Sequence, residues 1–181
     1  MLKLEIPDRE WFDESKMVFV KSHGGTIQLE HSLVSISKWE SKWKKPFLQV
    51  DNLQGDQLED YIRFMTITQN VKAELYKNLT PKNLEVIKNY IGDSMTATWF
   101  KENNKPKSRR IITSELIYCW MSEFGLPFET CQKWHLNRLL TLIRVCQEER
   151  SGTKDPRSNR EQMRDRNALN AARKKKYGTK G

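Results

Sequence analysis

A thiol and an imidazole lie four residues apart in the stretch CQKWH, at Cys131 and His135. If this stretch is helical, both side chains lie on one face, roughly 6 Å apart at Cβ. A cysteine beside a histidine base can form a catalytic nucleophile, and the same pair supplies two of the four ligands that zinc usually takes. Cysteine is also often buried as a small hydrophobic residue, so a structural interpretation is open as well.

The rest of the sequence supports neither chemical interpretation. No third group that would orient the imidazole lies nearby, and the two other cysteines, Cys119 and Cys146, match no metal-ligand spacing. His23 and His31 have no spaced carboxylate partners. The chain also lacks a GxGxxG fingerprint, a P-loop and an HExxH motif. We therefore predict a structural pair, no enzyme, no cofactor and no metal ion.

Two amphipathic segments determine how the pair is positioned, and the pair lies at the start of the second one. The segment ITSELIYCWMSEFG (112–125) has apolar residues at helical spacing, and CQKWHLNRLLTLIRVCQ (131–147) repeats the pattern. The short connection LPFE predicts that the two helices form an antiparallel hairpin. Cys131 and His135 are then expected in the first turn of its second helix.

The N-terminal residues alternate apolar and polar side chains, which predicts antiparallel strands at residues 2–6, 17–21 and 26–31. The pair Gly24–Gly25 predicts the hairpin turn between the second and third of these strands. The stretch PDREWFDE (7–14) follows the first strand and begins with proline. It predicts a loop that exposes Trp11 and Phe12.

Helical periodicity replaces this alternation further along the chain, at residues 32–43, 56–65 and 80–92. Ser32 is the expected N-cap of the first of these helices, and Thr80 followed by proline caps the third. Asp56 with Glu59 predicts a capping box in the second. Residues 92–110 predict a long surface connection.

The predicted fold class is α+β: a small N-terminal antiparallel β-sheet, a mostly helical body with a C-terminal helical hairpin, and a flexible basic tail. Residues 1–31 and 32–150 are expected to form one domain. Residues 151–181 carry ten Lys or Arg against three Asp or Glu, whereas the first 150 residues carry 22 against 20. The tail is therefore expected to be flexible or to form a helix only with a partner.

The net charge of +9 invites a nucleic-acid interpretation, but the balanced body lacks the basic folded face of a DNA reader. The cluster Arg173, Lys174, Lys175 and Lys176 can contact phosphates, or it can keep an assembly intermediate soluble. No apolar run approaches the ~20 residues of a membrane span, and the N-terminus lacks a signal-peptide pattern. Three scattered cysteines favour a reducing cytoplasm.

Six tryptophans divide into two groups. Four lie on predicted apolar helix faces and are expected in the core: Trp39, Trp43, Trp120 and Trp134. Trp11 and Trp99 lie in predicted loops, next to Phe12 and Phe100. Large rings outside the core favour a protein-binding surface, so we predict these four loop residues as partner-binding residues.

Stretches along nearly the whole chain resemble a family of small proteins of long-tailed bacteriophages and prophages of Gram-positive hosts. The stretches are LEIPDREWFDE, QLEHSLVSISKWESKW, YIRFMTITQNV, MTATWF, ITSELIYCWM, PFETCQKWHLNRLLTLIRVC and ALNAARKKKYGTKG. We associate this family with tail assembly chaperones. Such proteins look like mostly helical, non-catalytic proteins that hold the long tape measure protein while the tail tube polymerises around it.

The resemblance implies a non-catalytic protein that acts in the host cytoplasm. Its expected partners are the tape measure protein and the tail tube protein, with self-association as a further possibility and no membrane contact. It brings no catalytic residues. The alternative is a structural virion protein or a nucleic-acid-associated phage protein that uses the basic C-terminal tail.

Overall fold

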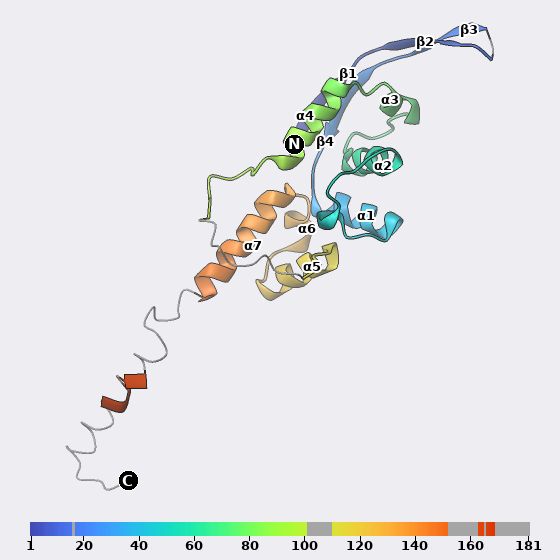
Figure 1. Cartoon of the computed structure of the whole chain (residues 1–181). Coiled ribbons are helices and arrows are strands. Elements are labelled where there is room, and N and C mark those ends of the chain that lie inside the picture. The colour runs from blue at the N-terminus through green and yellow to red at the C-terminus, as the bar shows by residue number, and fades with distance from the viewer. Residues whose placement is uncertain (16, 101–109, 152–162, 165, 169–181) are drawn as a thin grey trace, which may run out of the picture. The chain divides into compact units, whose positions relative to one another are not determined.

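The computed structural model describes residues 1–15, 17–100, 110–151, 163–164 and 166–168 (Figure 1). The chain divides into two units, Met1–Arg144 and Val145–Gly181. The first unit holds both sheets and the helices up to most of α7. The predicted α+β class is confirmed, because a small antiparallel β region precedes a mostly helical body.

Four strands form two antiparallel pairs that follow one another along a single ribbon. β1 (Leu2–Ile6) pairs with β4 (Gly25–Leu29), and β2 (Arg9–Asp13) pairs with β3 (Val18–Ser22). The β1–β4 pair lies against the helices, and the β2–β3 pair extends beyond them (Figure 1). We call the β2–β3 pair, residues 9–22, the arm.

Two sequence predictions about this ribbon are wrong. The stretch 7–14 is not a loop, because Arg9–Asp13 is strand β2. The turn is not at Gly24–Gly25 but between β2 and β3, where Met17 takes the positive φ of 54°. Gly24 instead allows a close approach: a Cβ there would lie 2.1 Å from the Ile6 carbonyl oxygen.

The helical predictions hold better because their caps are local. α1 (Leu33–Trp43) begins after Ser32, whose hydroxyl accepts from the backbone of Ser35, and α4 (Pro81–Gly92) begins after Thr80 in the same way. α2 (Asp56–Met65) is present, but its N-cap is Gly55 with no side-chain cap, so the capping box predicted at Asp56 and Glu59 is wrong. The remaining helical elements are η1 (Phe47–Gln49), α3 (Ala73–Lys77), α5 (Ser114–Glu123), α6 (Phe128–Cys131) and α7 (Leu136–Ser151).

One buried core joins the sheet to the helices. The inner face of the β1–β4 pair contributes Leu4, Ile6, Ile27 and Leu29. The helices contribute the largest enclosed side chains, among them Trp39, Tyr61, Ile62, Met65, Ile87, Ile117, Met121 and Leu136. Trp39 is fully buried, and Trp43, Trp120 and Trp134 are partly buried against the core, which confirms their predicted place.

Candidate functional site

The structure separates the cysteine and the histidine that the sequence places together. Cys131 ends the short helix α6, and α7 begins only at Leu136, so no helix face carries both. The helix cannot continue through this stretch because His135 forms a β-bridge with Ser32, and the Leu136 amide donates to the His31 carbonyl at 2.7 Å. The predicted position in the first turn of a hairpin helix is therefore wrong.

Cys131 and His135 have different surroundings. Cys131 is buried, and burial raises the pKa of its thiol, which disfavours the reactive thiolate. His135 is buried against Tyr90, whose carbonyl oxygen lies 3.0 Å from its Nε2. Among the described residues, no group of three or more His, Cys, Asp or Glu side chains could hold a metal ion.

A buried polar cluster that the sequence did not reveal surrounds His135. The rings of His31 and His135 lie 5.0 Å apart, and Nδ1 of His31 is hydrogen-bonded to the hydroxyl of Tyr61. The Tyr90 hydroxyl donates to Glu30 at 2.6 Å. Burial, and then the neighbouring His135, lower the pKa of His31 to about 3. This histidine is therefore uncharged at neutral pH and holds the sheet end to α2.

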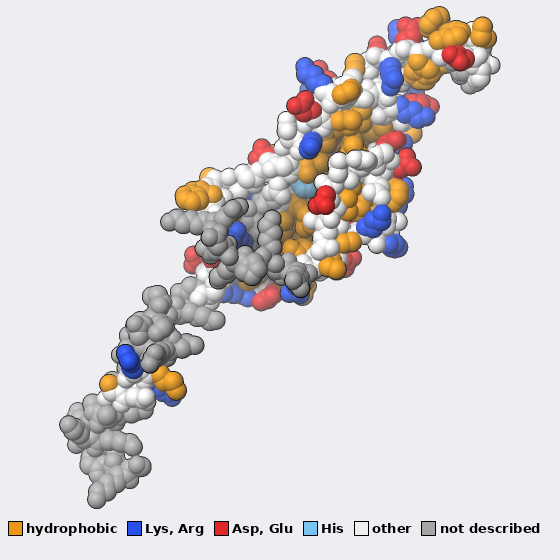
Figure 2. Space-filling model, viewed as in Figure 1, with side chains coloured by type: hydrophobic (Ala, Val, Ile, Leu, Met, Phe, Trp, Pro, Cys, Tyr) orange, Lys and Arg blue, Asp and Glu red, His pale blue; other side chains and the backbone are white. Residues whose placement is uncertain are grey.

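The arm carries exposed apolar side chains, whereas the rest of the sheet buries them. Exposed fractions reach 71 % at Phe19 and 74 % at Met17, with Trp11, Phe12 and Val18 between 40 % and 47 %. The rings of Phe12 and Phe19 are cross-strand neighbours, 5.1 Å apart at their centroids. Figure 2 shows hydrophobic side chains gathered at the far end of the arm. An apolar cluster of this kind is a candidate binding surface.

Side-chain contacts fix the base of the arm against α3. The Arg9 guanidinium donates to the Lys77 carbonyl at 2.9 Å, and the Asn78 amide donates to the Ser22 hydroxyl at 2.9 Å. Asn78 is itself 2 % exposed, and its hydrogen bond to Ser22 is partly buried. The arm therefore leaves the body in a defined direction.

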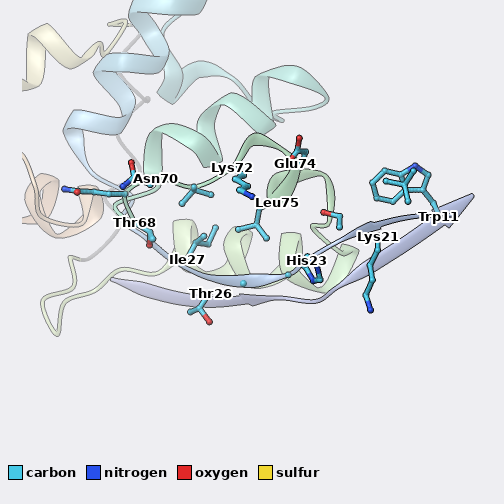
Figure 3. A pocket seen from close by; sticks show the side chains of 16 residues that line it. Trp11, Lys21, His23, Thr26, Ile27, Thr68, Asn70, Lys72, Glu74 and Leu75 are labelled. Carbon is cyan, nitrogen blue, oxygen red and sulfur yellow. The ribbon is translucent and has the colours of Figure 1, made fainter. Parts of the chain in front are cut away.

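A groove lies beside the base of the arm, between β3–β4 and the segment that leads into α3 (Figure 3). Its volume is about 710 Å³. Trp11 lies at one end of the groove, and Ile27 and Leu75 point toward its interior from opposite walls. Its lining combines apolar side chains with polar and charged ones, among them Lys21, His23 and Glu74.

A second, more apolar groove of about 480 Å³ lies between α4 and the segment that leads into α2. Its lining includes the aliphatic side chains of Val50, Leu53, Leu58, Leu84 and Ile91, together with charged residues such as Glu85 and Lys88. Such a surface could hold the apolar face of a helix.

The four predicted partner-binding residues do not form one site. Trp11 and Phe12 lie in the arm, which continues from the end of β1. Trp99 and Phe100 follow Met95, and Met95 shares a pocket with Met1 at the opposite end of β1. Trp99 is 76 % exposed. The Phe100 ring instead packs on Arg144, whose guanidinium carbon Cζ lies 3.8 Å from the ring centroid.

The predicted phosphate-contacting cluster, Arg173, Lys174, Lys175 and Lys176, lies outside the described residues. The sequence also missed part of the arm: Met17, Val18 and Phe19 complete its apolar surface. The run MVFV (17–20) was the available signal, because a strand that is apolar on both faces requires either burial or a partner.

Within the described ranges, none of the helices combines the length and apolar composition that a membrane crossing needs. Comparison with known proteins places the chain in no group. Neither a protein-family model, nor a curated protein, nor a solved structure matches it.

Proposed function

We propose that this chain is a non-catalytic binding protein that acts as a tail assembly chaperone of a long-tailed bacteriophage, in the host cytoplasm. The observation that carries the binding role is the arm, whose exposed rings stand apart from the core on a fixed base. The proposed partner is the tape measure protein, and the tail tube protein is the second candidate. Both rest on the sequence resemblance.

The chemistry of the arm suits such a partner. A long rod protein that has not yet been enclosed by its tube exposes apolar stripes, which aggregate unless they are covered. Phe12 and Phe19 form a pair of aromatic rings on one face of the arm, and Trp11 lies beside Val20 on the other face. Aromatic side chains of this kind supply most of the energy in many protein interfaces.

The double substitution Phe12→Ser and Phe19→Ser tests the role of the arm. The chain is co-expressed with the long helical rod protein that the proposal expects to be encoded beside it, and the rod that co-purifies is quantified. We expect at least a tenfold loss of co-purified rod, because removal of two interface aromatics costs about 2 kcal/mol or more.

Ile111→Ser is the matched control, since Ile111 is 57 % exposed and lies outside the arm. It should leave the yield of rod unchanged. If the unaltered chain neither solubilises nor co-purifies the rod, the chaperone proposal fails. If the rod binds and the double variant retains full binding, the arm is not the binding surface.

A further inference from the structure

The two long edges of the ribbon differ in how they are protected. The β1 side of the ribbon lies against α4, where the Asn83 amide donates to the Glu5 carbonyl at 3.0 Å, and β2 carries the charged residues Arg9 and Glu10. Along β3, whose sequence is VFVKS, Lys21 is the one charged residue, and the Asn78 amide contacts Ser22 at the base of the strand. Proteins usually guard an open edge strand with charges, proline or a covering segment, because its backbone can pair with another chain.

The far end of the same edge already pairs with a short segment of the chain, through an isolated bridge between Leu29 and Thr66. The Ile67 amide donates to the Gln28 carbonyl at 2.8 Å, and the Glu30 amide donates to the Met65 carbonyl at 2.9 Å. These hydrogen bonds show that the backbone N–H and C=O groups of even-numbered β4 residues point away from β1. Thr26 is also even-numbered, so its backbone groups point away from β1 and toward the groove. This segment leaves the edge at Thr68, whose hydroxyl accepts from the Gln28 amide.

We propose that β3 pairs with β3 of a second copy of this chain, antiparallel and about a twofold axis. The axis passes beside Val20, the centre of the five-residue strand Val18–Ser22. The product is a four-stranded sheet in the order β2, β3, β3, β2. A twofold axis makes the two edge strands antiparallel, so each edge is complementary to itself.

The sequence of β3 fits this register. Val20 lies opposite Val20 of the second copy. Because Trp11 is the cross-strand neighbour of Val20, the four side chains form one row across the sheet, with a Trp11 at each end. Lys21 meets Phe19 of the second copy, so the two lysines never face one another. Like charges opposite one another would oppose pairing, and this register contains none at the pairing edge.

The base of the arm limits the length of the contact. Asn78, the C-cap of α3, donates to the Ser22 hydroxyl, so pairing centred on Val20 ends where the body begins. Five paired residues make a small interface, for which we expect a dissociation constant on the order of 100 μM. Both faces of the arm stay open, and dimerisation doubles the aromatic surface. This inference does not rest on the proposed phage partner and can fail independently of it.

Cross-linking through an introduced cysteine tests the register, with the buried Cys131 left in place. In a Cys119→Ser and Cys146→Ser background, Val20→Cys should form a disulfide-linked dimer on mild oxidation, since opposite residues of antiparallel strands lie within disulfide range. Glu10→Cys is the matched control, because the two β2 strands would lie about 14 Å apart. We expect at least tenfold less dimer from the control. Equal cross-linking of both variants, or stronger cross-linking of Glu10→Cys, would overturn the proposal.

Sedimentation of the unaltered chain gives an independent reading. The average mass should rise from 21.5 kDa at low concentration toward about twice that value at several hundred micromolar. Val20→Lys places a charge opposite its own copy and should keep the mass at that of the monomer. A mass that does not rise with concentration contradicts the proposal, as does a Val20→Lys variant that associates as the unaltered chain does.

Discussion

Replacing Glu40 by alanine is expected to lower the free energy of unfolding by roughly 3 kcal/mol. The side chain is 8 % exposed, and each carboxylate oxygen accepts one backbone N–H at 2.8 Å, from Phe47 and from Ser114. α1 is thereby tied to η1 and to the first turn of α5, which has no side-chain cap of its own. Alanine leaves both buried donors without a partner. Urea unfolding measures the loss.

Glu59→Ala is the control for this prediction. Glu59 lies on α2 and pairs with Arg63 at 2.6 Å, but both side chains are 39 % exposed. An exposed pair of this kind contributes below about 1 kcal/mol. Equal losses in the two variants would show that the Glu40 bonds do not hold the three elements together.

Acidification is expected to remove roughly 3 kcal/mol of stability between pH 7.5 and pH 4.5 through His31 alone. Its pKa in the folded protein is about 3, against an ordinary value of 6.5. Between these values the unfolded chain binds a proton that the folded chain does not. The contribution is therefore complete above pH 6.5 and is lost as the pH falls toward 3.

Unfolding curves of His31→Gln over the same pH range isolate this contribution. The variant should lose stability less steeply than the unaltered chain below pH 6.5, because no buried imidazole remains at position 31. His23→Gln removes an exposed histidine and serves as the control. If His31→Gln and the unaltered chain show the same slope, His31 is not the buried group that the structure describes.

Local signals predicted the elements that are capped or punctuated by their own neighbours. α1 and α4 were predicted with the correct caps because Ser32 and Thr80 act within four residues of themselves. The arm was predicted wrongly because Pro7 and the glycine pair are typical of turns. The close approach of Gly24 to Ile6 and Pro7 depends on which strands pair, and that is a long-range property.

The error at Cys131 and His135 has the same origin. The apolar period runs unbroken from Cys131 to Cys146, and the interruption comes from a β-bridge to Ser32, about a hundred residues away in the sequence. The buried pair His31 and His135 is likewise a long-range contact. Trp11 and Phe12 were predicted as exposed aromatics and are exposed, but on a strand.

The arm links the two proposals for this protein. Its faces would bind the partner, while its free edge would bind a second copy. Each role uses different atoms, because pairing engages the backbone of β3 and the rings of Phe12 and Phe19 stay on one face. Dimerisation would therefore strengthen binding to a long repetitive rod through two linked contacts.

Hydrogen–deuterium exchange on the purified complex with the rod protein is the most direct test of the central claim. The chain is measured alone and in the complex, at a concentration too low for self-association. We predict that amides of residues 9–22 exchange at least tenfold more slowly in the complex, because the rod covers the arm. A complex that protects only helices α1 to α7, with the exchange of the arm unchanged, would contradict the proposal that the arm is the binding surface.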